Sequence, residues 1–277
     1  MAIVLSLLAA AAYGVSDFVG GVFSKRVSPW SVAFVGALAG AAVVAAFTAV
    51  DGGEPRRADY AWGLLAGVGN GLGTAFLYRG LSSGRMGVVA PVSGVGAALL
   101  PVVVGLASGE RPGPVVWTGM VVALPAIWLV ASEPAASEVT APGSGLFDGV
   151  LAGLGFGTLF AALAQIPEQS GFLPLAFNQL VAAVLIAVVA GALRSAWVPR
   201  ERAAYAGVIS GSLGALATGL FLVATHEGYL TVSAVIVSLY PAFTVLLAFS
   251  VLREHVHRIQ AVGLALCGVA VALVAGG

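Results

Sequence analysis

Charged side chains are scarce in this sequence. Asp, Glu, Lys and Arg together make up 9% of the 277 residues, whereas 60% of the residues are hydrophobic. A soluble domain carries about 25% charged residues, because they must cover its surface in water. The mean hydropathy of +1.04 agrees with this deficit. The composition therefore excludes an ordinary soluble domain and predicts an integral membrane protein.

Lysine and cysteine are nearly absent, and each absence excludes a class of site. The only lysine, Lys25, has no Gly-x-x-x-x-Gly-Lys-Ser/Thr motif around it, so a P-loop ATPase is excluded. The only cysteine, Cys267, excludes an internal disulfide and argues against a cysteine-based metal site. Gly-x-Ser-x-Gly and His-Glu-x-x-His motifs are also missing. We therefore expect no enzyme, no cofactor and no metal, and any energy must come from an ion gradient or from the solute's own gradient.

Long apolar runs fill the remainder of the chain. A bilayer core is spanned by about 20 apolar residues in a helix, because backbone groups in lipid must be bonded within the segment. Turn residues and charges separate the runs, as at Ser28-Pro29 and at 51–57. Hydropathy predicts an all-α membrane protein with ten transmembrane helices at 3–22, 30–50, 60–80, 87–107, 114–131, 145–166, 172–193, 203–225, 230–252 and 259–276.

An internal repeat divides these spans into two halves. The longest polar interruption, 132–144, lies at mid-chain and reads as a linker between residues 1–131 and 145–277. Glu110 and Glu254, 144 residues apart, close the fourth and ninth spans. The same offset brings glycine-rich positions of the third span onto the eighth, including Gly63 onto Gly207. Five spans per half reverse the second copy in the membrane, so we predict two inverted five-helix repeats around a central cavity.

Two motifs resemble the EamA-like family of the drug/metabolite transporter superfamily. Tyr13-Gly14-Val15-Ser16-Asp17-Phe18, followed by Ser24-Lys25 and Pro29, is similar to the opening of the family's first span. The run 239–247, beginning Leu239-Tyr240-Pro241, with Glu254 and Gly263 after it, is similar to the family's Pro-x-Phe-x-x-Leu-Leu motif. A weaker copy, from Val95 to Pro101 with Glu110 and Gly119, stands at the matching place in the first half.

The resemblance implies a secondary transporter, usually an exporter of amino acids, other small metabolites or drugs. It also implies a central cavity lined by the first, third, fourth, sixth, eighth and ninth helices. The sequence departs from the family at two places. Gly36 stands near the position of an arginine that is often present in the second span, with Gln179 as its counterpart, and Ala97 matches Pro241. The substrate therefore cannot be carried over from the family.

Asp17 is the only acidic residue well inside a predicted span. Its burial must be offset by a partner, by water or by protonation, and the low dielectric favours the neutral form that a proton-coupled carrier uses. A substrate ammonium group is another possible partner. The structural alternatives are hydration near the helix end or pairing with Lys25 two turns away.

Further polar residues within the spans predict a modestly polar, uncharged cavity. Each of them alone is as readily explained by a hydrogen bond between helices. The candidate substrate-binding or coupling residues are Tyr13, Ser16, Asp17, Asn70, Ser93, Gln165, Thr218, Ser238 and Tyr240.

Other features leave alternatives open. Pro91, Pro101 and Pro241 are expected to loosen their helices, because proline removes a backbone donor. Glu110 and Glu254 are interpreted mainly as structural, with a gating salt bridge to the adjacent arginine as the alternative. The pair His255 and His257 is interpreted as surface histidines rather than as a metal site.

The partners and the location follow from the same reasoning. We expect a small-molecule solute and the lipid bilayer as partners, protons as a candidate coupling ion, and no nucleic acid. The small-residue stripes are interpreted as packing within a monomer rather than as a dimer interface. We expect a multi-pass protein of the plasma (inner) membrane. An intramembrane enzyme acting on a lipid or isoprenoid substrate, and a passive channel, are the alternative functions.

Orientation in the membrane is not settled by charge. Nine basic residues fall in or beside odd-numbered loops and three, namely Arg56, Arg57 and Arg111, in even-numbered loops. The positive-inside rule then places both termini outside, whereas the family is usually drawn with both termini in the cytoplasm.

Overall fold

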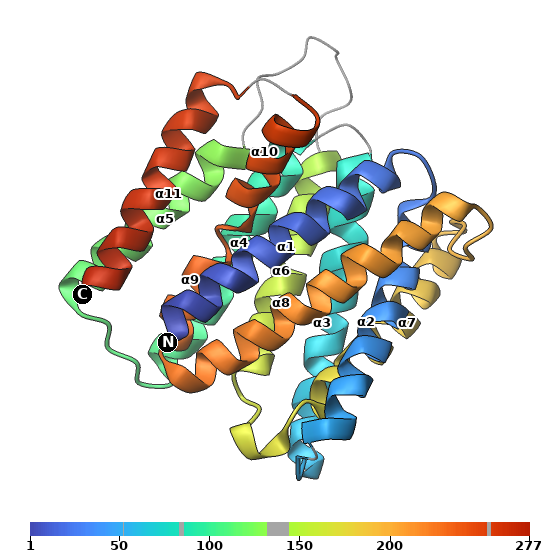
Figure 1. The fold of residues 1–277 in the computed structure, drawn as a ribbon, viewed down its shortest axis with the longest axis horizontal. Helices are drawn as coiled ribbons and strands as arrows, with labels where there is room; N and C mark the ends of the chain where they lie inside the picture. The colour runs from blue at the N-terminus through green and yellow to red at the C-terminus, as the bar shows by residue number, and fades with distance from the viewer. Residues whose placement is uncertain (52, 83–85, 132–143, 254–255) are drawn as a thin grey trace.

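The computed structural model describes residues 1–51, 53–82, 86–131, 144–253 and 256–277, and these form a bundle of helices (Figure 1). No β-strand occurs in these ranges. The longer helices are α1 (Ala2–Ser24), α2 (Pro29–Asp51), α3 (Arg57–Ser82), α4 (Met86–Ala107), α5 (Pro114–Ala131), α6 (Ser144–Leu163), α7 (Leu173–Ala192), α8 (Gly207–Glu227), α9 (Leu230–Val237), α10 (Tyr240–Val251) and α11 (Arg258–Gly276), and two short 3₁₀ helices are η1 (Glu168–Ser170) and η2 (Arg202–Ala206).

Most of these helices have the length and composition of membrane spans. Within the described residues, eight segments are long and apolar enough to cross a bilayer, counting α9 and α10 as one, and 92–107 of α4 is a shorter apolar stretch. Helix α3 is not among them, and its six glycines and Asn70 lower its hydropathy. The chain is thus a multi-pass membrane protein, while the count of ten spans and the repeat stay predictions.

The chain termini lie on one side of the bundle (Figure 1). We call this side the terminal face; it carries Met1, the connections 108–113, 164–172 and 228–229, and Gly277. The opposite side, the distal face, carries the connections 25–28, 193–206 and 252–257 as far as they are described. Successive helices therefore run in opposite directions, with α9 and α10 counted as one, and α1 and α6 start on opposite faces.

Glycine lets helices from the two halves of the chain approach one another at backbone distance. A Cβ at Gly153 in α6 would lie 3.0 Å from the Cα of Gly96 in α4. A Cβ at Gly67 in α3 would lie 2.7 Å from the carbonyl oxygen of Asn178 in α7. A Cβ at Gly211 in α8 would collide with the backbone of Gly36 in α2. The small-residue stripes thus pack helices within the chain, as predicted.

The ninth predicted span is not one helix. Helix α9 ends at Val237 and α10 begins at Tyr240, with a turn at Ser238 and Leu239 between them. Pro241 has no N–H to donate to the carbonyl of Val237, so the regular helical bonding is interrupted there. The sixth predicted span is also corrected, because α6 ends at Leu163 and 164–166 form a turn before Pro167.

An ion pair joins α3 to α6. Arg79 Nε donates to Asp148 Oδ1 over 3.0 Å, and the guanidinium also lies over the ring of Phe76, 4.4 Å from its centroid. The side chain of Asp148 is only 7% exposed. Removing the arginine would leave a buried carboxylate without its counter-charge.

We therefore expect Arg79→Met to lower the thermal unfolding midpoint in detergent by roughly 5 °C, the size expected for an uncompensated, partly buried charge. Asp148→Asn in the same chain should recover most of that loss. The measurement is thermal unfolding of the three purified proteins. A double variant as unstable as Arg79→Met would show that the arginine acts through packing alone.

Candidate functional site

A small cavity lies in the middle of the bundle, between α1, α2, α3, α6, α7 and α8. Its volume is about 50 Å³, which holds a few water molecules but no organic solute. The side chains that give it polarity belong to Tyr13, Ser16, Asp17, Asn70, Thr74, Tyr78, Gln179, Ser210 and Thr218. We call this space the central cavity.

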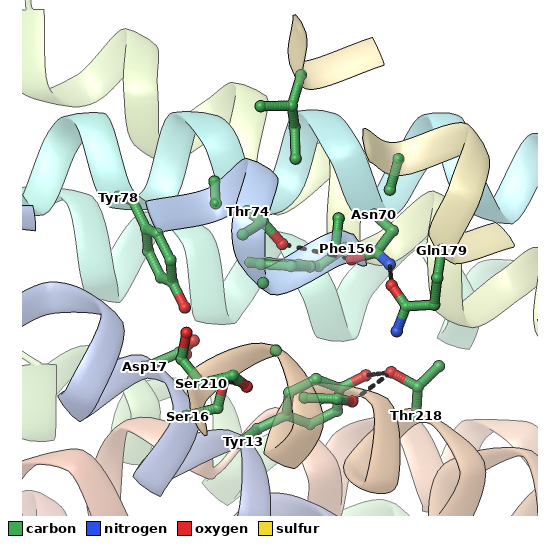
Figure 2. A pocket seen from close by; sticks show the side chains of 17 residues that line it. Tyr13, Ser16, Asp17, Asn70, Thr74, Tyr78, Phe156, Gln179, Ser210 and Thr218 are labelled. Carbon is green, nitrogen blue, oxygen red and sulfur yellow. Dashed lines mark hydrogen bonds between the residues drawn. The ribbon is translucent and has the colours of Figure 1, made fainter. Parts of the chain in front are cut away.

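Asp17 lies at the distal end of the central cavity. Figure 2 shows the hydroxyl of Tyr78, from α3, pointing toward Asp17 and Ser16 of α1. The ring of Tyr78 fits there because residue 20 is glycine, since a Cβ at Gly20 would collide with that ring. Ser16 donates its own hydroxyl to the carbonyl of Ser210 over 2.7 Å. The carboxyl thus lies among polar groups of α1, α3 and α8.

Asp17 has no ionic partner among the residues that the structure describes. The residue is 8% exposed and forms no hydrogen bond with a described residue. Within the described ranges the one ion pair joins Arg79 and Asp148, so Asp17 and Lys25 are not paired. The carboxyl is therefore largely buried without a counter-charge, a position that a cationic group would complement.

Amide and hydroxyl groups line the remainder of the central cavity (Figure 2). Asn70 donates to Gln179 Oε1 over 2.8 Å and to Asn178 Oδ1 over 3.3 Å, which ties α3 to α7. Thr74 donates to Asn70 Oδ1 over 3.3 Å. On the other side, the hydroxyls of Tyr13 and Thr218 are 2.6 Å apart. The polar groups of the cavity wall are thus uncharged apart from Asp17, and residues such as Phe156 and Ile186 supply its apolar part.

A much larger space begins on the other side of Asp17. This vestibule, of about 770 Å³, reaches toward the distal face between α1, α3, α4, α10 and the start of α11. Most of its wall is apolar, with Phe18, Leu77 and Phe249 among the larger side chains. Its polar side chains are Asp17, Lys25, Tyr240, Thr244, His257 and Gln260. Its volume is in the range of organic ligand sites.

Aromatic rings seal the central cavity from the terminal face. The ring of Phe160 lies 5.8 Å from that of Tyr13 and 4.6 Å from that of Phe221. Phe160 and Phe221 are 1% and 0% exposed. A solute at Asp17 thus has space on the distal side and packed side chains on the terminal side.

The structure brings together most of the predicted site residues. Tyr13, Ser16, Asp17, Asn70 and Thr218 line the central cavity, and Tyr240 lines the vestibule. Ser93 lies behind Tyr240, with the two hydroxyls 3.2 Å apart.

Two predicted site residues lie elsewhere. Gln165 is in the turn after α6, where its amide donates to the carbonyl of Ala161, because the helix ends earlier than hydropathy suggested. Ser238 is fully buried at the α9–α10 break and lines neither space.

Several lining residues escaped the sequence reasoning. Gln179 and Ser210 are isolated polar residues in predicted spans, which is the signal that identified Asn70. Tyr78 stands beside Arg79 and resembled a residue of a helix end. The helix list implied by the family resemblance also lacked α2 and α7, which line the central cavity.

The predictions for the charged residues and histidines at helix ends differ in their outcome. The Glu110 carboxylate binds the backbone of Leu230 and Thr231, not Arg111. Glu254 and His255 lie outside the described residues. Within those residues, no group of three or more His, Cys, Asp or Glu side chains is placed to hold a metal ion.

Comparisons with known proteins agree with this architecture. No curated protein matches the sequence significantly, but 18 chains of solved structures match the fold. One crystal structure superposes with a TM-score of 0.72 at 19% identity, covering 98% of this chain and 95% of that one, and so shows the fold alone. The profile of the EamA-like transporter family matches twice, over residues 1–132 and 143–276. This chain therefore belongs to the EamA-like transporter family.

Proposed function

We propose that this chain is a secondary carrier of the plasma membrane that exports a small organic solute bearing an ammonium group, by alternating access in exchange for protons. The observation that carries the proposal is the position of Asp17. It borders both the central cavity and the vestibule, and it is the only acidic residue among the described residues that line either space.

The charge distribution favours a cationic group at the inner end of the vestibule. Lys25 and His257 also line the vestibule. Lys25 is eight residues after Asp17 in α1, so it lies roughly 12 Å further along the helix axis. An ammonium group at Asp17 gains a counter-charge in a place of low dielectric, whereas an anion there meets repulsion.

Apolar walls indicate the remainder of the solute. Phe18, Leu77 and Phe249 offer contact area for hydrocarbon or aromatic parts, and these side chains cannot satisfy many polar groups. Amine-bearing amino acids, metabolites and drugs with an apolar body fit this description. The central cavity is too small for them, so the solute is held in the vestibule with only its amine at Asp17.

Exchange with protons follows from competition for one carboxylate. A carboxylate can bind an ammonium group or a proton, but not both at once. The two cargoes therefore cannot be carried through the transport cycle together. Either cargo also neutralises the charge of Asp17 while the carrier changes from the state open through the vestibule to the state open through the aromatic seal, or back. Coupling then needs no second titratable group in the cavity.

The test uses purified protein in liposomes that contain a pH-sensitive dye. A panel pairs apolar primary amines with their uncharged hydroxyl analogues of the same shape. We expect amines, and not the analogues, to drive proton movement that saturates with concentration and shows counterflow. Flux that never saturates would support a channel, and equal responses to both members of each pair would exclude the ammonium assignment.

A further inference from the structure

The N-terminus of α9 is capped by the other half of the chain. Glu110, in the connection between α4 and α5, accepts a hydrogen bond from the backbone N–H of Leu230 over 2.5 Å and another from that of Thr231 over 2.9 Å. Tyr229, at the N-cap position, gives no side-chain hydrogen bond. A carboxylate is favourable there, because unpaired N–H groups and the helix dipole point toward it.

The surroundings are shaped for this contact. A Cβ at Gly105 would lie 2.5 Å from Glu110 Oε2 and 2.8 Å from Thr231 Cγ2, so only glycine leaves the carboxylate and the helix end this close. Arg111 donates to the carbonyls of Leu106 and Glu110 instead of to the carboxylate. The carboxylate of Glu110 is therefore committed to α9.

Helix α9 begins at the terminal face and packs into the buried core. Leu230, Ala234 and Val237 are part of the same buried cluster as Tyr13 and Phe221. The helix also contacts α1, α4 and α8. Movement of α9 would therefore loosen its contacts with α1 and α8, which carry Tyr13 and Phe221 of the aromatic seal.

Three of the buried hydroxyl groups without a partner lie in α1 and α9 near the terminal face, while Ser24 and Ser238 are further examples elsewhere in the described residues. Ser6 of α1 and Thr231 and Ser233 of α9 are fully buried, and their hydroxyls have no hydrogen-bond partner among the described residues. A buried hydroxyl without a partner is unfavourable, so such groups are uncommon in a permanently closed core. Thr231 faces α4, where its methyl group lies close to Gly105, so water between α1 and α9 would serve Ser6 and Ser233 and not Thr231.

The chain also allows α9 to move by itself. The break at Ser238 and Leu239 separates α9 from α10, which lines the vestibule. A tilt of α9 therefore need not move α10 by the same amount. Because α9 has only eight residues, two hydrogen bonds at its first turn hold a large part of it in place.

We propose that Glu110 is a latch that holds the terminal face closed in this conformation, and that its release opens a path between α1 and α9. The proposal rests on the alternating access proposed above and specifies what controls its terminal side. It assigns Glu110 a conformational role without contact to the solute.

The test measures access by thiol labelling and needs no substrate. In a Cys267→Ala background, Ser6→Cys reports on the terminal path and Ala248→Cys reports on the vestibule. With Glu110 intact, we expect a water-soluble maleimide to label the Ala248→Cys thiol quickly and the Ser6→Cys thiol slowly. Adding Glu110→Gln should raise the labelling rate of Ser6→Cys about tenfold, the size of one capping interaction, and lower that of Ala248→Cys.

Glu227→Gln is the matched control. Glu227 is an exposed acid at the same face, at the end of α8, and has no hydrogen bond or ion pair with a described residue, so its variant should leave both rates unchanged. Unchanged labelling of Ser6→Cys in the Glu110 variant would overturn the latch. An equal rise at both positions would overturn it too, because that pattern indicates general loosening.

The two proposals can fail separately. Labelling depends on neither the solute nor Asp17, so a missing amine response with the expected labelling would remove the ammonium assignment alone. A clear amine response with unchanged labelling would remove the latch alone.

Discussion

Asp17→Asn is expected to abolish amine-driven proton movement in liposomes and to weaken binding of the same amine roughly 100-fold, the usual scale for losing one partner of a buried charge pair. The substitution keeps the size of the side chain and leaves an oxygen that can accept a hydrogen bond. It removes the negative charge and the site that a proton could occupy. Folding should be unaffected, because no ion pair with a described residue depends on this carboxyl.

Glu168→Gln is the control for this result. Glu168 is an exposed acidic residue of η1 at the terminal face, so its replacement removes an equal charge away from both spaces. Binding of the amine should also lose its dependence on pH in the Asp17 variant and retain it in the Glu168 variant. Wild-type flux and an unaltered pH profile in Asp17→Asn would remove Asp17 from the coupling mechanism.

Gly211→Ala is expected to cause the largest loss of stability from a single added carbon. A Cβ at this position collides with the backbone of Gly36, and backbone in a packed helix cannot rotate away as a side chain can. Overpacking of this kind costs about 1–3 kcal/mol and here forces α2 and α8 apart. The readout is the fraction that remains monodisperse after heating in detergent, followed by size-exclusion chromatography.

Gly268→Ala provides the comparison within the same protein. Gly268 lies inside α11 with nothing within 4 Å of the position where a Cβ would be. Alanine there restricts the unfolded chain and favours the helix, so stability should be unchanged or slightly higher. Equal losses in the two variants would show that helix composition, and not the contact between α2 and α8, decides the effect.

Some of the site could be predicted from the residue types alone. Asp17 and Asn70 stand out in any hydropathy trace. Placing a polar side chain inside a membrane span is energetically unfavourable, so such residues usually have a functional role. Their positions relative to one another could not be predicted, since a helix shows which residues share its face but not what that face meets. Gln179 was passed over for this reason, and only its bond to Asn70 places it in the cavity wall.

The sequence by itself determined the membrane environment, most of the helix limits and the family, because each depends on local composition or on short motifs. Pro241 marked a weak point in its span, but the two separate helices around it appear only in the structure. Tertiary packing alone decided that Asp17 lies between a small cavity and a large vestibule, and that Glu110 holds a helix 120 residues away. Such contacts join distant parts of the chain, and their energies depend on geometry that no local pattern contains.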